Sequence, residues 1–130
     1  MLQRTKKLLE DNALGLAIIA TIIIAILSLS HIPKINFGLK IEISDKYLHT
    51  LAYFTLTLVW YFALREKINK SNFKYLIISG LIFYGIILEA LQGGITNYRT
   101  ADFYDIVANI IGIVLAAVIF NRIINWYNTI

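Results

Sequence analysis

The chain has 130 residues, of which 58% are hydrophobic and 15% charged, and its mean hydropathy is +0.70. Soluble domains carry roughly 25% charged residues, so this composition excludes an ordinary water-soluble fold and indicates an integral membrane protein. The chain contains no cysteine, which excludes disulfides and thiolate catalysis, and its net charge of +4 requires no nucleic-acid partner.

Four apolar stretches are each long enough to cross a bilayer as a helix of roughly 20 residues. They cover residues 13–32, 45–64, 75–92 and 102–120, with approximate ends. His31 ends the first stretch, whereas His49 and Glu89 are the ionisable groups inside the second and third. The fourth begins with acids and is apolar beyond Asn109. The sequence therefore predicts an all-α, membrane-spanning four-helix bundle that forms one domain over residues 1–130.

Basic residues predict the orientation of these helices. Eight of the twelve lysines and arginines precede the first stretch, follow the fourth, or lie between the second and third. By the positive-inside rule, both termini and the connection after the second stretch face the cytoplasm. Aromatic residues near these positions are expected at the membrane interface: Trp60, Tyr61, Tyr75, Trp126 and Tyr127.

Polar residues gather at the ends of the last three stretches that this orientation places outside. They are Asp45, Lys46, His49 and Tyr53 in the second, Glu89 and Gln92 in the third, and Arg99, Asp102, Asp105 and Asn109 at the fourth. On a helix, each stretch presents one polar face, formed by Asp45, His49 and Tyr53 at i, i+4 and i+8, by Glu89 and Gln92 at i and i+3, and by Asp102, Asp105 and Asn109 at i, i+3 and i+7, with Arg99 just before it. Ionisable groups in lipid usually face each other or a wet cavity, so the pattern predicts a shared outward-facing site.

Local helix chemistry explains part of this pattern. Asp102 and Asp105 fit a capping arrangement at the start of a helix, where acids also suit the helix dipole. Capping does not explain Glu89, which lies near a helix C-terminus, or His49, a full turn inside its helix. An interhelical polar network with a purely structural role is one alternative, and Asn109 is its most typical member.

Three strings of the sequence resemble a known family. DKYLHTLAY, EALQ and YRTADFYDIVANIIG are similar to the VanZ-like family of small bacterial membrane proteins, whose pattern is D-K-x-x-H, E-x-x-Q and R-x-x-D-x-x-D-x-x-x-N-x-x-G. The resemblance covers about residues 45–120. It implies a multi-pass protein of the bacterial cytoplasmic membrane, in a family whose founding member is linked to teicoplanin resistance. Ala116 stands where a further glycine often follows, although Gly112 and Ala116 still offer small residues for close helix packing.

Two functional hypotheses follow for the outer site. As an enzyme acting on a lipid-linked or amphipathic envelope molecule, it would use His49 as general acid/base. Glu89 or Asp105 would orient the histidine or activate water, and Arg99 with Lys46 would neutralise a phosphate or carboxylate.

As a binding site without turnover, it would hold a membrane lipid or lipid-linked ligand. Lys46 and Arg99 would bind the anion, and Gln92 and Asn109 would give direction. No metal or cofactor is expected, because this region contains a single histidine and no motif with the spacing of metal ligands. The oligomeric state is left open.

Overall fold

The computed structural model describes residues 1–29, 42–69, 72–95 and 102–130, with only the backbone described at 42–45 and 95. Every element in these ranges is helical, which confirms the predicted all-α class. The helices are α1 (Leu2–Leu29), α2 (Glu42–Ala63), α3 (Arg65–Ile68), α4 (Phe73–Ile95) and α5 (Phe103–Thr129).

The helices extend beyond the ends that hydropathy predicts. α1 begins at Leu2 instead of near residue 13, and α5 ends at Thr129 instead of near residue 120. Hydropathy marks the part of a helix that suits lipid, whereas charged residues continue a helix equally well. The two extensions meet, because the Tyr127 hydroxyl donates to Glu10 Oε1 at 3.0 Å.

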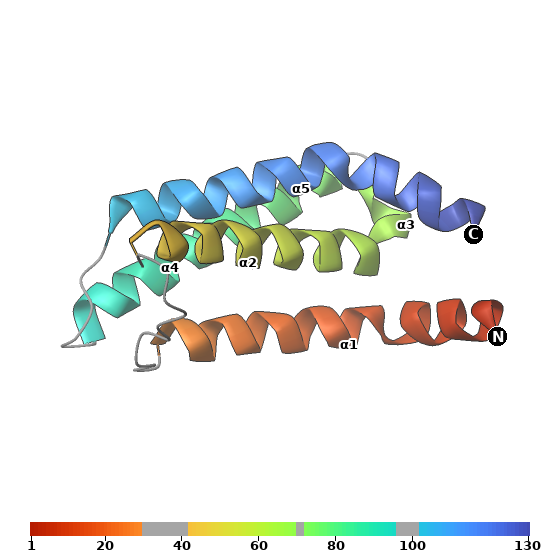
Figure 1. Ribbon diagram of the computed structural model, residues 1–130, viewed down its shortest axis with the longest axis horizontal. Coiled ribbons are helices and arrows are strands. Elements are labelled where there is room, and N and C mark those ends of the chain that lie inside the picture. The colour runs from red at the N-terminus through yellow and green to blue at the C-terminus, as the bar shows by residue number, and fades with distance from the viewer. Residues whose placement is uncertain (30–41, 70–71, 96–101) are drawn as a thin grey trace.

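The four long helices run back and forth along the long axis of the molecule (Figure 1). Both termini and α3 lie at one end, and the starts of α2 and α5 lie at the other. α2 packs most extensively on α5 and also contacts α1 and α4. α2 is therefore in contact with all three other long helices, while Tyr47, Leu48 and Leu51 near its start are exposed.

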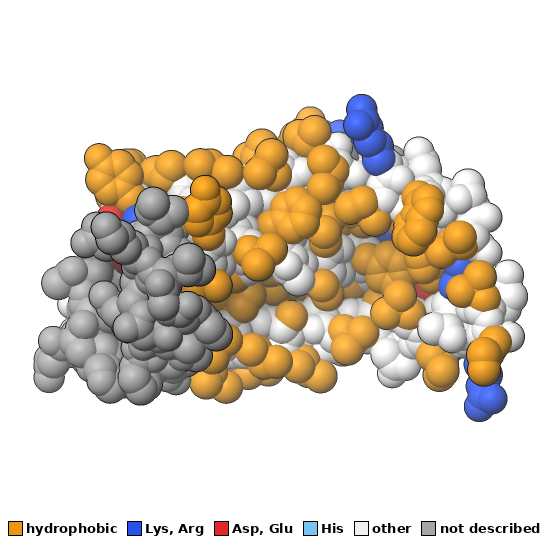
Figure 2. All heavy atoms as spheres, in the orientation of Figure 1, with side chains coloured by type: hydrophobic (Ala, Val, Ile, Leu, Met, Phe, Trp, Pro, Cys, Tyr) orange, Lys and Arg blue, Asp and Glu red, His pale blue; other side chains and the backbone are white. Residues whose placement is uncertain are grey.

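Three helices are long and apolar enough to cross a membrane: Leu2–Leu29, Phe73–Gly94 and Phe103–Thr129. Exposed apolar side chains such as Ile22, Phe83 and Val118 lie on their outer surfaces, and Figure 2 shows hydrophobic side chains over most of one face. Contiguous exposed apolar surface of this extent is what a lipid-facing protein requires. These features support a membrane protein.

α2 is absent from that set of three, although its residues match the second predicted span. Lys46 and His49, together with several threonines and tyrosines, lower its hydropathy. Its position explains how such a helix is tolerated: Tyr53, Leu56 and Thr57 are buried against neighbouring helices. The four-span arrangement therefore stays a prediction.

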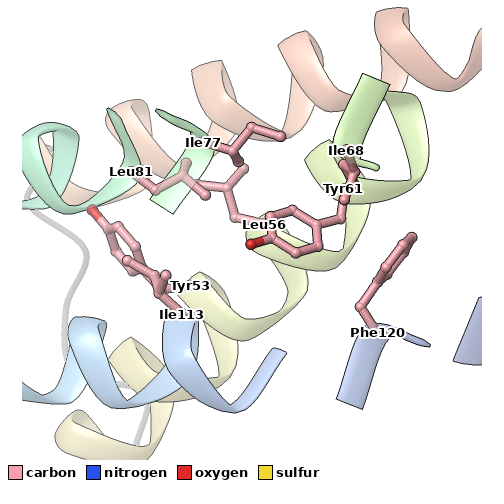
Figure 3. Close-up of a cluster of buried hydrophobic side chains, with 8 residues drawn as sticks. All are labelled: Tyr53, Leu56, Tyr61, Ile68, Ile77, Leu81, Ile113 and Phe120. Carbon is pink, nitrogen blue, oxygen red and sulfur yellow. The ribbon is translucent and has the colours of Figure 1, made fainter. Parts of the chain in front are cut away.

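The apolar core joins α2 to its neighbours (Figure 3). Leu56 on α2 and Ile113 on α5 are fully buried, and the Tyr61 ring packs edge-on against Phe120 with centroids 5.2 Å apart. Burying a Leu or Ile side chain contributes about 1.5–3 kcal/mol relative to water. In lipid, however, the gain comes from packing contacts.

Polar side chains also fasten α1 to the bundle. The Trp60 indole donates to Thr21 Oγ1 at 2.9 Å, and the Tyr84 hydroxyl donates to the Thr21 carbonyl. Tyr61 is 2% exposed and donates to the Lys74 carbonyl. Trp60 and Tyr61 thus take part in helix packing. Tyr75 and Trp126 are exposed, as residues at a membrane interface would be.

Candidate functional site

Polar side chains from α2, α4 and the start of α5 lie close together and range from exposed to buried. This group is called the polar cluster and consists of Lys46, His49, Glu89, Asp102, Asp105 and Asn109. Lys46 Nζ lies 2.6 Å from Asp102 Oδ2 and also pairs with Asp105. The Asp102 side chain accepts a hydrogen bond from the Tyr104 N–H at 2.9 Å, so it is the N-cap of α5, as predicted. The hydrogen bond from Lys46 holds the pKa of Asp102 below its ordinary value.

His49 lies deeper in the polar cluster, between two residues of α5. Its Nε2 is 3.5 Å from Asp105 Oδ2, and its Nδ1 is 3.1 Å from Asn109 Oδ1. Asp105 and Asn109 of α5 therefore hold the His49 ring between them, with one ring nitrogen facing each residue.

Glu89 has a different partner from the one expected. Its Oε1 accepts a hydrogen bond from the backbone N–H of Asp102 at 2.6 Å, whereas Asp105 and Asn109 are the residues that contact His49. Glu89 lies in the C-terminal part of α4 but against the N-terminus of α5, where unpaired N–H groups and the dipole favour an anion. This position resolves the apparent conflict between its charge and the C-terminal end of α4.

Gln92 and Tyr53 are buried in helix contacts. Gln92 donates from Nε2 to the Ser28 carbonyl at 2.6 Å and so joins α4 to α1. Tyr53 packs against Tyr84, with ring centroids 6.2 Å apart. The sequence pattern grouped both residues with the polar site, and in the structure both are buried between helices.

Two other predicted site residues fall outside what the structure describes. Arg99 lies outside the described residues, and so does the side chain of Asp45, whose backbone belongs to α2.

Close helix approach underlies the polar cluster. A Cβ on Gly112 of α5 would collide with the Thr50 carbonyl oxygen of α2 and lie 3.0 Å from the Phe54 nitrogen. The Thr50 hydroxyl donates to the Ala108 carbonyl at 3.2 Å. Gly112 therefore allows the two backbones to touch, which keeps Lys46 and its acids within reach of each other.

Sequence reasoning missed Thr50 and Gly85. Thr50 lies four residues after Lys46, and Gly85 lies four residues before Glu89, so each shares the polar face of its helix. A Cβ on Gly85 would lie 3.1 Å from the Asn109 amide nitrogen. Extending each polar stripe by one turn would have found both.

The polar cluster forms a gradient from surface to interior. The side chains of Lys46 and Asp102 are 37% and 42% exposed, that of Asp105 is 10% exposed, and Asn109 is buried. Throughout the described part of the chain, every buried side-chain nitrogen or oxygen has a hydrogen-bond partner. The same residues include no group of three His, Cys, Asp or Glu side chains arranged to hold a metal ion.

Comparison with known proteins found one informative relative. An uncharacterized protein of Schizosaccharomyces pombe is 37% identical to this chain over 79 residues, which are 61% of this chain and 48% of the yeast protein. The chain thus spans about half the length of this relative. No protein-family model matches the chain. No solved structure matches it either.

These findings correct the resemblance to the VanZ-like family. No family model supports it, and the relative found is a fungal protein, so the implied bacterial origin and glycopeptide resistance are unsupported as well. The physical reason lies in the motif itself. Polar residues on one face of any helix recur at spacings of three, four or seven residues. A few acids, amides and a histidine at these spacings therefore indicate a polar helix face and do not identify a family.

Proposed function

We propose that the protein crosses the membrane four times, with both termini in the cytoplasm. The position of the two termini at one end of the molecule supports an even number of crossings (Figure 1). The excess of basic residues in the termini and in the α2–α4 connection supports their cytoplasmic placement. On this topology the polar cluster faces outward, at the level of lipid headgroups.

We further propose that the polar cluster binds the polar part of a membrane lipid or lipid-linked molecule. The observation that carries this proposal is the continuous path of polar contacts from exposed Lys46 and Asp102 to Asp105 and His49. A phosphate or carboxylate approaching Lys46 would replace Asp102, the more exposed of its two acids, and leave Asp105 on His49. Asp102 would keep its hydrogen bond from the Tyr104 N–H, and water can solvate its side chain, which is 42% exposed.

Binding is better supported than turnover. Both ring nitrogens of His49 lie against α5, 3.5 Å from Asp105 and 3.1 Å from Asn109, so a reacting group would have to displace one of these residues first. Turnover would keep the roles expected from the sequence, with His49 as general acid/base and Asp105 orienting it.

A structural role is the second candidate, and a specific observation favours it. The buried polar groups of the described residues are mutually satisfied, and Glu89 and Gln92 both bind backbone groups of neighbouring helices. In this case the polar cluster specifies how α2, α4 and α5 pack and has no ligand.

One experiment separates these candidates. The full chain is purified in mild detergent, and copurifying amphipathic molecules are identified by mass spectrometry for the wild type, Lys46→Gln and Lys74→Gln. Lys74 lies in the first turn of α4, where its carbonyl accepts from Tyr61 near the end of α2, and receives the same substitution as a control. A binding site predicts that Lys46→Gln, still folded, loses a specific molecule that Lys74→Gln retains.

A structural network predicts a different result. Lys46→Gln and His49→Gln would then lower thermal stability without changing the bound molecules. Paired apolar replacement of His49 and Asn109 would restore stability.

A further inference from the structure

An apolar groove of about 540 Å³ lies between α1, α2 and α5, on the half of the molecule that carries the termini. Its lining includes Leu9, Leu16 and Ile23 on α1, Phe62 on α2 and Tyr127 on α5. Between Leu9 and Ile23 a helix rises by about 21 Å. One leaflet of a bilayer has a hydrocarbon depth of roughly 15 Å, so the groove is long enough for the acyl chain of one lipid.

Charged side chains stand at the mouth of this groove. Lys6 Nζ lies 4.7 Å from the centroid of the Tyr127 ring, and the Arg65 guanidinium lies 4.7 Å from that of Phe62. Both rings line the groove. Glu10 lies 3.8 Å from Arg65 and accepts from the Tyr127 hydroxyl. The mouth therefore brings together two cations and one acid, and Figure 2 shows basic side chains toward this end.

We propose that this groove binds one anionic phospholipid, with an acyl chain between the helices and its phosphate at Lys6 and Arg65. An apolar helix of another protein would fill the groove without using the two cations. A zwitterionic lipid would use them less, because its own cation opposes theirs. An anionic lipid matches both the apolar length and the charge at the mouth. The site lies at the opposite end from the polar cluster and does not depend on its function.

The headgroup contribution is tested by native mass spectrometry of the full chain in detergent. Phosphatidylglycerol and phosphatidylcholine with identical acyl chains are compared, and preferential retention of phosphatidylglycerol is expected. Lys6→Gln should weaken its binding about fivefold, the effect of one cation near an anionic headgroup. Lys74→Gln is the matched control, because Lys74 also stands over an aromatic ring, 5.1 Å from that of Tyr75, but outside the groove.

Glu10→Gln tests the same site in the opposite direction. The glutamine keeps an oxygen for the Tyr127 hydroxyl and removes the negative charge beside Arg65. Binding of phosphatidylglycerol should therefore become tighter, while binding of phosphatidylcholine changes little. An unchanged or weaker affinity for phosphatidylglycerol would contradict the proposed position of the phosphate.

The groove itself is tested with two leucines of α1. Leu16 lines the groove and is 44% exposed, whereas Leu14 is 50% exposed and lies outside it. Leu16→Trp should reduce retention of both lipids, and Leu14→Trp should leave it unchanged, with circular dichroism and gel filtration confirming that both variants are folded.

Three further results would overturn the proposal. The first is equal retention of the two lipids by the wild type. The second is an equal loss in Lys6→Gln and Lys74→Gln, which would indicate general surface attraction. The third is displacement of the lipid by inorganic phosphate at equal concentration, with no effect of Leu16→Trp, which would indicate a site for the free anion.

Discussion

Replacing Gly112 by alanine tests the close contact between α2 and α5. The added Cβ would overlap the Thr50 carbonyl oxygen and approach the Phe54 nitrogen to 3.0 Å. Carbon atoms in ordinary contact lie about 3.5–4.0 Å apart, so the helices must separate locally to accept it. Both obstacles are backbone atoms, so no change of rotamer relieves the overlap.

The expected loss in the free energy of unfolding has two contributions. Overpacking a well-packed interface costs about 1–3 kcal/mol. Separation by more than half an ångström also stretches the contact between His49 Nδ1 and Asn109 Oδ1 from 3.1 Å beyond hydrogen-bonding range. Losing that bond costs about 0.5–1.5 kcal/mol. Gly112→Ala should therefore lower the free energy of unfolding by about 2–4 kcal/mol.

Two other glycines provide controls. Gly80 on α4 has no atom within 4 Å of an added Cβ, so Gly80→Ala should be neutral or stabilise by up to about 1 kcal/mol through helix propensity. Gly85 faces the ends of the Asn109 and Tyr53 side chains, at 3.1 and 3.3 Å. These ends can move, so Gly85→Ala should cost about 1 kcal/mol, an intermediate value.

Reversible unfolding in mixed micelles, followed by far-ultraviolet circular dichroism, measures all three variants. The reasoning predicts the stability order Gly80→Ala, then Gly85→Ala, then Gly112→Ala. A Gly112→Ala protein within about 1 kcal/mol of Gly80→Ala would refute the close approach of α2 and α5.

Two further predictions concern the start of α5. Glu89→Gln keeps an oxygen for the Asp102 N–H and should cost only about 0.3–1 kcal/mol from the lost charge, whereas Glu89→Leu leaves that donor without its acceptor and should cost about 1–3 kcal/mol in the same unfolding assay. Equal losses in both variants would contradict the hydrogen bond. Lys46 depresses the pKa of Asp102, so this pair stabilises the fold at pH above roughly 4 and the contribution fades as the pH falls through the lowered pKa. Thermal unfolding from neutral to acidic pH should show a smaller acid-induced loss in Lys46→Gln than in the wild type, and identical profiles would count against the ion pair.

Helical periodicity was sufficient to predict which ends of the helices carry the polar residues. It placed Asp45, His49 and Tyr53 on one face and Asp102, Asp105 and Asn109 on another. The structure brings His49 of the first face, and Lys46 beside it, against the second face. Periodicity could not predict the partners of Glu89 and Gln92, because both bind backbone groups. Nearly every residue has a backbone N–H and a carbonyl, so the sequence does not indicate which of these groups will bind a given side chain.

Hydropathy was informative about lipid contact and poor at helix ends. It did not indicate that α1 starts at Leu2 or that α5 reaches Thr129, because these segments are charged and pair with each other through Glu10 and Tyr127. Hydropathy also grouped α2 with the other three spans, although Lys46 and His49 make α2 less apolar than those helices. The contacts of α2 with its three neighbours depend on tertiary packing, which composition alone does not predict.

The dependence of both α2 and α4 on α5 has a consequence for biogenesis. α5 is made after α2 and α4, yet it supplies the acids for Lys46, the acceptor for His49 and the N–H group for Glu89. Until α5 emerges from the ribosome, the earlier helices present an ammonium, an imidazole and a carboxylate that lipid solvates poorly. A nascent chain stopped before residue 102 should therefore be held at the insertion machinery or degraded, and stable integration becomes a late, nearly all-or-none event in synthesis.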